Sequence, residues 1–332
     1  MQEKLRAELL GILHAVAFPA PDTVALAGST VDPRAAGQIT GLSAAANPMV
    51  AQLQQLFYDS CYCRRFDGAR RRVMLPAPDA GFVATLAAAN AGREHWDAGW
   101  QIQQTLPSGQ IVASKGDLTR MVWPGEFHSH GPPGMPPSVG TAISLFAAKE
   151  SRTMQPGFYL VFGEALGDQA EEFALVRLYW NVTASGAAQL IAAVTEALNR
   201  FAIPFRFKCL CVAQLFDRSD AAVLYIAKRH YRITAQLLAD VYRAVGPTLK
   251  AATPLFTKKL ADGLGLAENP KTGESFGLHR CRLLAEAVCN AHVRGLDSAE
   301  ARLSEVVATF TAAGLALERP YLNPGSADCY AF

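Results

Sequence analysis

The sequence lacks the features of several large protein classes. Its N-terminus mixes acidic, basic and apolar residues at helical spacing, without the unbroken apolar middle and small-residue cleavage site of a signal peptide. No apolar run is long and clean enough to span a bilayer. The formal net charge is only +2, which gives no support for broad binding to nucleic acid or membranes. We expect neither as a partner, so any phosphate recognition must come from a local cluster.

Patterns that identify disulfide, zinc or nucleotide chemistry are also missing. The seven cysteines are odd in number and none forms a Cys-x-x-Cys pair, which favours reduced thiols and a cytoplasmic location over a disulfide framework or a zinc ribbon. No Gly-x-x-x-x-Gly-Lys, Gly-x-Gly-x-x-Gly or Gly-x-Ser-x-Gly pattern is present. Nucleotide cofactors and serine hydrolysis therefore have no support.

What is present is the composition of a globular, enzyme-sized chain. The 332 residues are 50% hydrophobic and 18% charged, enough to bury a large core. Apolar stripes over Leu5–Leu13 and Met49–Phe66 predict helices, with a loop over Ala25–Asn47 between them. We therefore divide the chain into a helical N-terminal segment, residues 1–75, and an α+β domain, residues 76–332.

Residues 76–332 show both strand and helix patterns. We expect an α+β fold in which the helical N-terminal segment packs on a mixed, largely antiparallel sheet with flanking helices. A polar loop over residues 262–277 is unusually long for a stretch without a function. The strands are predicted over Trp100–Thr105, Gln110–Lys115, Phe158–Phe162, Phe173–Trp180, Ile203–Cys211 and Asp220–Ile226, and the helices over Ala187–Phe201, Thr234–Val245, the stretch from Leu278 onward and Ser298–Ala313.

The strand over Ile203–Cys211 has the most informative pattern. Side chains of a strand alternate between its two faces, so the apolar residues share one face while Arg206 and Lys208 fall together on the other. If the reverse side of the strand is buried, the backbone under these two cations is fixed in place. An anion-binding site requires cations whose positions are fixed in this way. A half-buried strand with solvated basic residues is the alternative, and strand statistics alone favour it.

Two other stretches carry candidate chemistry. His128 and His130 follow Glu126 in a pattern similar to the JAMM zinc isopeptidases, but the third ligand position is Thr141, so a Pro/Gly loop with two available acid or base side chains is the better interpretation. At the start of the helix after Gly277, backbone N–H groups could bind phosphate together with His279 and Arg280. The alternative there is a surface loop in which Ser275 caps the helix.

Several motifs resemble the HopA family, which contains type III secreted effectors of plant pathogens and homologous proteins of bacterial peptide-natural-product clusters. The resemblance covers most of the chain from about residue 75 onward. The motifs are Leu75–Phe82, Trp96–Trp100, Pro156–Tyr159, Arg177–Asn181, Pro204–Lys208, Arg218–Tyr225, Phe256–Lys258, Gly273–Arg280 and Pro320–Pro324.

The resemblance implies a lyase. Cluster-encoded relatives work with a separate kinase in making class V lanthipeptides and thioamitides: the kinase phosphorylates Ser or Thr of a ribosomal precursor peptide, and the lyase eliminates phosphate to leave a dehydroamino acid. The partners would be the phosphorylated precursor, with its leader and core, and the cognate kinase. Residues 1–75 could dock either. The alternative is an effector-like protein that binds host or partner proteins without this catalysis; a metal isopeptidase is disfavoured.

Elimination of phosphate needs a base, fixed cations and an acid, but no metal or redox cofactor. Lysine suits the base and arginine suits phosphate, because the guanidinium binds two oxygens at once. We assign these roles by chemistry to residues in or near the motifs. The catalytic candidates are Lys208, Lys115, His279 and His128; the phosphate-binding candidates are Arg206, Arg218, Lys258, Arg280 and Ser275; the supporting candidates are Asp220, Tyr225 and Asn181.

Overall fold

The structure is a computed structural model, and it describes residues 3–20, 23–30, 47–71, 77 and 79–332. Residues 31–46 of the predicted N-terminal loop and residues 75, 76 and 78 of the first motif therefore lie outside the described residues. No helix of the described ranges has the length and apolar character needed to cross a membrane.

The centre of the molecule is a seven-stranded sheet in the order β14-β15-β11-β13-β12-β10-β9. Each pair of neighbouring strands in this sheet is antiparallel. Its strands are β9 (Glu150–Ser151), β10 (Phe158–Phe162), β11 (Leu175–Trp180), β12 (Phe205–Leu210), β13 (Ala222–Ala227), β14 (Lys258–Ala261) and β15 (Leu264–Glu268).

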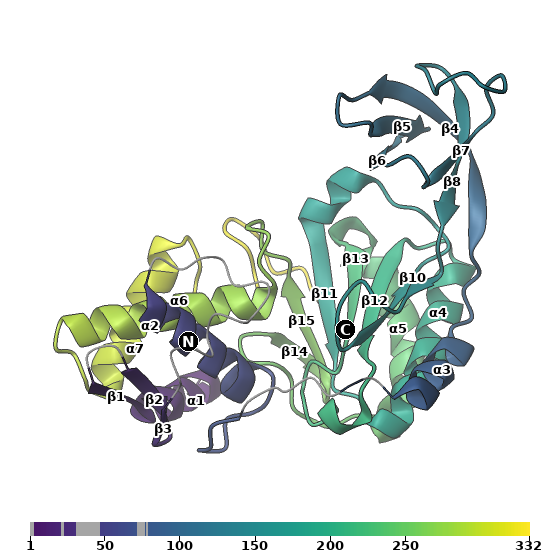
Figure 1. The fold of residues 1–332 in the computed structure, drawn as a ribbon. Helices are drawn as coiled ribbons and strands as arrows, with labels where there is room; N and C mark the ends of the chain where they lie inside the picture. The colour runs from purple at the N-terminus through teal and green to yellow at the C-terminus, as the bar shows by residue number, and fades with distance from the viewer. Residues whose placement is uncertain (1–2, 21–22, 31–46, 72–76, 78) are drawn as a thin grey trace.

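Helices cover one side of this sheet because its strands carry an apolar face. In β12, Phe205, Phe207 and Cys209 are buried whereas Arg206 and Lys208 are only partly buried, as the alternation predicted. The covering helices are α3 (Ala80–Ala89), α4 (Ala187–Arg200) and α5 (Tyr231–Val245), which lie together in Figure 1. The short 3-10 helices are η3 (Gln169–Ala174), η4 (Ala184–Gly186), η5 (Ala213–Leu215), η6 (Lys228–His230) and η7 (Gly246–Thr248).

The two ends of the chain build a second, mainly helical layer beside β14 and β15 (Figure 1). Helix α2 packs on α6, and α1 packs on α7. Arg302 of α7 donates hydrogen bonds to the backbone oxygens of Leu13 and Val16 at 2.9 and 2.8 Å. The elements are α1 (Glu3–His14), β1 (Val16–Ala20), β2 (Thr23–Leu26), β3 (Ser29–Thr30), α2 (Pro48–Phe57), the π-helical turn η2 (Tyr58–Tyr62), α6 (Phe276–Val293) and α7 (Ala299–Ala312).

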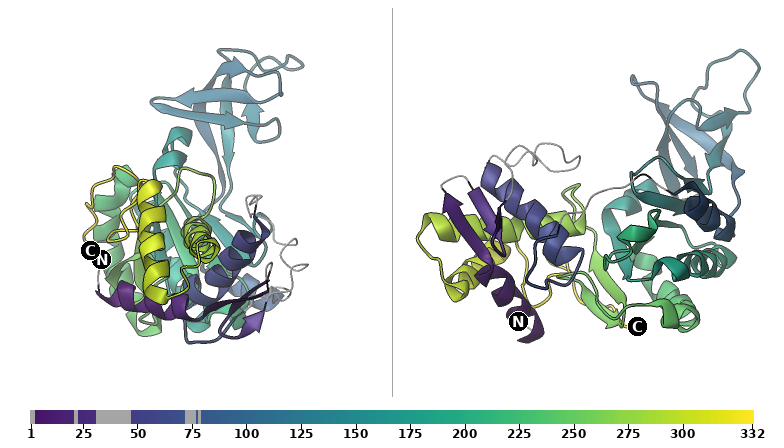
Figure 2. Two further views of the ribbon diagram at one scale, coloured as in Figure 1. Left: turned by 90° about the vertical axis from the view of Figure 1, so that its left-hand side faces the viewer. Right: turned by 60° about the horizontal axis from the view of Figure 1, so that its bottom comes forward.

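A five-stranded antiparallel sheet projects from the rest of the molecule in both Figure 1 and Figure 2. It has a small core of its own around Trp100 and Ile102. The predicted hairpin closed near Pro107–Gly109 is confirmed within it, since β4 pairs with β5. The strands are β4 (His95–Thr105), β5 (Ile111–Lys115), β6 (Leu118–Val122), β7 (Phe127–Ser129) and β8 (Ala142–Ala147).

The α+β class is confirmed, and two local predictions are corrected. Residues 264–268, predicted as part of a polar loop, form the buried strand β15 between β11 and β14. The segment before residue 75 is not wholly helical, because β1, β2 and β3 form a small sheet. The division at residue 75 stays a prediction.

Candidate functional site

A row of charged and aromatic side chains crosses three central strands. The strand register places Arg177 opposite Tyr225 and Tyr225 opposite Arg206, so all three share one face of the sheet. The guanidinium carbons of Arg177 and Arg206 lie 5.1 and 5.0 Å from the centroid of the Tyr225 ring. Arg177 is also hydrogen-bonded to Asn269 through its Nε at 2.8 Å. Two arginines thus bracket one phenol.

Lys208 lies on the same face, one pleat farther along β12. Its Nζ is 4.3 Å from the centroid of the Phe158 ring. Burial alone would raise the pKa of Tyr225, but the positive charges of Lys208, Arg177 and Arg206 outweigh it and lower that pKa. The phenol therefore reports a strong local positive potential on this face.

A buried ion pair lies beside Lys208. Arg218 and Asp220 are each 3% exposed and form two hydrogen bonds of 2.8 Å, from Nε to Oδ1 and from Nη2 to Oδ2. Burial raises the pKa of Asp220, but Arg218 and, to a lesser extent, Lys208 lower it further, so the carboxylate stays ionised. We call Arg177, Arg206, Lys208 and Arg218 the basic face.

Aromatic side chains from the helical layer cover part of the basic face. Tyr58 accepts a 3.4 Å hydrogen bond from Arg218, and Tyr62 packs edge-on to Tyr179 with ring centroids 6.4 Å apart. Phe276, the first residue of α6, contacts both Tyr62 and Tyr179. The layer built from the two chain ends therefore forms one wall of the site.

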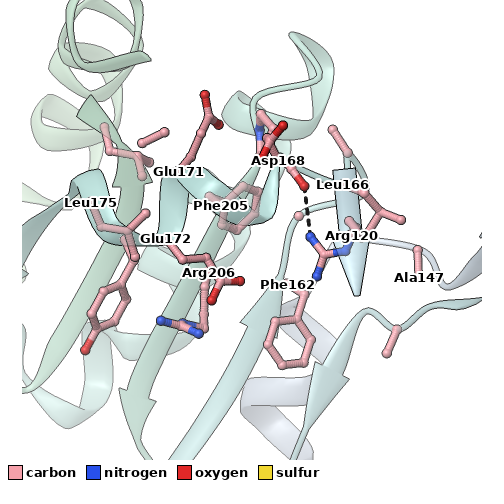
Figure 3. Close-up of a pocket in the computed structure, with 18 of the residues that line it drawn as sticks. Arg120, Ala147, Phe162, Leu166, Asp168, Glu171, Glu172, Leu175, Phe205 and Arg206 are labelled. Carbon is pink, nitrogen blue, oxygen red and sulfur yellow. Dashed lines mark hydrogen bonds between the residues drawn. The ribbon is translucent and has the colours of Figure 1, made fainter. Parts of the chain in front are cut away.

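A cavity of about 320 Å³ opens beside the basic face (Figure 3). Arg206 of the basic face is part of the cavity lining, and so is the adjacent Tyr225. Figure 3 shows Phe162, Phe205 and Leu175 around Arg206, with Arg120 from the projecting sheet on the other side, where it donates a 2.9 Å hydrogen bond to the Gly167 oxygen. The carboxylates of the lining are those of Asp168, Glu171 and Glu172. The cavity lining thus combines apolar side chains with two arginines and three carboxylates, and Arg206 joins it to the basic face.

The first turn of α6 contributes less directly than the sequence predicted. Ser275 caps the helix, accepting a hydrogen bond from the Leu278 amide at 3.3 Å. Arg280 is buried and donates to the backbone oxygens of Pro320 and Leu322 and to Nδ1 of His279. Burial and the charge of Arg280 lower the pKa of His279 to about 4. Arg280 thus holds the segment around Pro320 against α6 by hydrogen bonds. The imidazole of His279 is neutral near pH 7.

The remaining candidates lie elsewhere. Lys258 is paired with Asp328, 2.8 Å away, and donates to the Tyr330 oxygen. Asn181 donates to the Ala252 oxygen at 2.8 Å, at the far end of β11 from Arg177. Neither residue contacts the basic face in the contacts that the structure describes.

Lys115 and His128 belong to the projecting sheet. Lys115 of β5 forms an ion pair with Asp97 at 2.7 Å. His128 of β7 lies 5.1 Å from His130 between ring centroids, next to Trp96. Within the described ranges, no group of three or more His, Cys, Asp or Glu side chains is arranged to hold a metal ion. The structure therefore brings together Lys208, Arg206, Arg218, Asp220 and Tyr225, but not these two.

The sequence reasoning missed Arg177 and the tyrosines of the wall. Arg177 is a charged residue inside the otherwise apolar strand Leu175–Trp180, where every neighbour is buried or half-buried. A lone arginine within such a strand is expensive to bury without a purpose, and this was the available signal. No local pattern brings Tyr58 or Tyr62 to the sheet, because their positions depend on the packing of α2 against α6.

The comparisons with known proteins identify a family for this chain. The model of the HopA1 effector protein family matches residues 149–322, a little over half of the chain. That region includes the whole basic face, whereas Lys115 and His128 precede it. No curated protein matches the chain.

Two solved structures are similar over nearly the whole length. The effector protein from Pseudomonas syringae pv. tomato strain DC3000 is 16% identical with a TM-score of 0.42, covering 88% of this chain and 94% of that one. The effector protein from Pseudomonas syringae pv. syringae strain 61 is 14% identical with a TM-score of 0.43, covering 97% and 98%. On the match of the family model, this chain belongs to the HopA1 effector protein family.

Proposed function

We propose that this protein is a lyase that eliminates phosphate from phosphorylated Ser or Thr of a ribosomal precursor peptide, leaving dehydroalanine or dehydrobutyrine. The observation that carries the proposal is the basic face, where Lys208 and Arg206 of β12 and Arg177 of β11 share one surface across β13, and where Arg206 also lines a cavity of about 320 Å³. Such a face suits a dianionic ester whose peptide chain occupies the cavity.

The chain supplies each part of the reaction. The Nζ of Lys208 takes the α-proton of the phosphorylated residue, and the electron pair of that C–H bond becomes the Cα=Cβ double bond. The Cβ–O bond breaks, and phosphate leaves with both electrons. Arg206 and Arg177 hold the departing phosphate oxygens, and the Tyr225 hydroxyl between them donates a proton to that group. Asp220 balances Arg218 and holds it against Phe158 and Tyr58.

The test is direct turnover of a peptide that contains phosphothreonine. We expect mass spectrometry to show loss of phosphoric acid, and an added thiol to form an adduct with the dehydrobutyrine. Lys208→Ala should lower kcat by roughly 100- to 10,000-fold, the usual effect of removing an acid–base catalyst. Arg206→Gln should lower kcat/KM, because it removes a phosphate contact. Lys259→Ala is the matched control, since Lys259 is exposed on the edge strand β14 and pairs with Asp262.

No conversion by wild type, or equal conversion by wild type and Lys208→Ala, would overturn the assignment. The partners we propose are the phosphorylated precursor and the kinase that phosphorylates it. A kinase gene and a short precursor gene beside this one would support the biosynthetic role.

An effector-like binding role is the second candidate. It is favoured by the family match and by exposed aromatic side chains on the projecting sheet, where Trp96 is 51% and Phe146 is 42% exposed and their ring centroids lie 5.2 Å apart. A secretion-chaperone gene next to this one, together with no turnover of phosphopeptides by wild type, would favour this role over the lyase.

A further inference from the structure

A second cavity, of about 360 Å³, lies at the other end of β11 from the first. The first cavity is lined by Leu175 at the start of that strand, and the second by Asn181, directly after its end. We call it the basic pocket. Its charged lining residues are Arg64, Arg65, Arg71, Lys250, Asp67 and Asp217.

Two of the four cations in the basic pocket are already neutralised. Arg64 forms two hydrogen bonds with Asp217, at 2.7 and 2.8 Å, and Arg71 pairs with Asp67 at 2.6 Å. Arg65 and Lys250 have no carboxylate within ion-pair distance among the described residues. The Nζ of Lys250 donates a hydrogen bond to the backbone oxygen of Phe216, and the residue is half-buried. Among the described residues, the pocket therefore presents two cations that form no ion pair.

The two free cations are attached to different parts of the fold. Arg65 follows the π-helical turn η2, whereas Lys250 follows the 3-10 helix η7. A single phosphate would need both cations at one point. Two anionic groups on one flexible chain can pair with the two cations separately, and the carboxylate side chains of a peptide supply such groups.

One loop connects the basic pocket with the basic face. In residues 217–220, Asp217 and Ser219 line the pocket, while Arg218 and Asp220 form the buried ion pair of the basic face. The Ser219 amide and hydroxyl are tied to the backbone oxygen of Cys63, directly before Arg64. The pocket is thus separate from the chemistry but built on the loop that positions Arg218.

We propose that the basic pocket binds an acidic segment of the peptide substrate through two of its carboxylates, one at Arg65 and one at Lys250. This inference rests on the proposed function for the identity of the peptide, because the segment is remote from the phosphorylated residue of the same chain. Binding there contributes affinity and selects phosphopeptides that carry acidic residues at a distance from the reacting position.

Binding can be measured without turnover. The probe is a fluorescein-labelled, unphosphorylated peptide of alternating Glu and Ser, and its binding is measured by fluorescence anisotropy. The comparison peptide has Gln in place of each Glu. We expect the Glu peptide to bind wild type at least about tenfold more tightly, with an affinity that falls as salt is added. Arg65→Gln combined with Lys250→Gln should remove most of that difference. Arg243→Gln combined with Lys259→Gln, at two exposed cations outside the basic pocket, is the charge-matched control, and thermal melting checks that each variant folds.

Equal binding of the Glu and Gln peptides by wild type, or unchanged binding by the double variant, would overturn the proposal. So would displacement of the Glu peptide by inorganic phosphate as effective as displacement by unlabelled Glu peptide, since that would identify a free-anion site.

Turnover separates this inference from the proposed function. With a phosphothreonine peptide carrying a Glu-rich tail, the double variant should raise KM about tenfold and leave kcat unchanged, while a Gln-tailed peptide shows no such change. If the double variant changed KM equally for the Glu-tailed and the Gln-tailed peptides, the proposed role of the pocket in substrate binding would be overturned. Absence of turnover by wild type, with the anisotropy difference intact, would instead overturn the lyase assignment and leave peptide binding in place.

Discussion

Single side chains near the start of α6 show how burial decides protonation. His279 is 8% exposed and accepts a hydrogen bond on Nδ1 from the always-charged Arg280 at 2.8 Å. A proton on Nδ1 would remove that bond and place two positive charges side by side. The neutral imidazole therefore carries its proton on Nε2, and His279 is a poor source of a proton near neutral pH.

This arrangement predicts an acid-sensitive fold. The pKa of His279 is lowered to about 4 in the folded chain, against about 6.5 when unfolded. Between these values the unfolded state binds the extra proton, so stability is fully present above about pH 6.5 and is lost as pH falls toward about 4. We expect the free energy of unfolding to fall by up to about 3 kcal/mol over this range, measured by urea titration at a series of pH values.

His279→Gln is the comparison that isolates the effect, because the Gln carbonyl can still accept from Arg280 but has no proton to take up. Its stability should change less than that of wild type between about pH 6.5 and about pH 5, above the range where most carboxylates titrate. Parallel pH profiles for the two proteins would contradict the assignment.

The position of a single side chain could be predicted from the sequence only where its spatial neighbours are also close in the sequence. The period-two alternation of a strand placed Arg206 and Lys208 together, and the structure agrees. The partners of Lys258 and Arg280 come from residues 320–330, and no sequence pattern links these segments. Their charges were therefore assigned to phosphate before their protein partners were known.

Among the elements, α6 approaches the site unusually closely. Gly277, in its first turn, lies against the ring of Tyr62, and a Cβ at Gly277 would be 2.4 Å from the Tyr62 Cε1 atom. Tyr62 in turn packs against Tyr179 on the sheet. The absence of a side chain at Gly277 therefore allows α6 and the Tyr62 ring to pack close to β11.

We predict that Gly277→Ala destabilises the fold by about 1–3 kcal/mol, the usual cost of overpacking, despite the better helix propensity of alanine. Because the ring that must move belongs to the wall of the site, kcat/KM for a phosphopeptide should fall as well. Urea unfolding and turnover measure the two effects.

Gly246→Ala is the matched control, since nothing lies within 4 Å of a Cβ built there and its φ is not positive. Alanine at that position should be neutral or slightly stabilising. If both variants behaved alike, close packing at Gly277 would not be the reason for its glycine.

The error at β15 shows the limit of pattern reading for elements. Leu264–Glu268 is short, contains a glycine and is bounded by polar turns, so its sequence suits a loop. Its place between β11 and β14 comes from tertiary pairing. Gly265 is needed there because a Cβ would lie 2.8 Å from the Thr257 Oγ1 atom. By contrast, α4 and α5 were predicted well because their apolar positions repeat over several turns.

For the whole molecule, the decisive feature is that the first and last parts of the chain build one layer. Gln54 of α2 donates a hydrogen bond to the Leu278 oxygen at 3.0 Å, and Arg302 of α7 donates to backbone oxygens at the end of α1 and the start of β1. Tyr58 and Tyr62 then complete the wall over the basic face. A linear division at residue 75 would separate these contacts from the helices that depend on them.

We therefore predict that a fragment of residues 76–332 will not retain the stability of the full chain. The fragment lacks α2, which packs on α6, and Tyr62 of η2, which packs against Tyr179. The fragment should unfold at a clearly lower temperature, bind the dye ANS and lose phosphopeptide turnover. Adding a separate fragment of residues 1–75 should restore part of the melting temperature, because the interface that reassembles is largely apolar. A fragment that melts like the full chain, with no response to residues 1–75, would instead show that residues 76–332 fold as an independent domain.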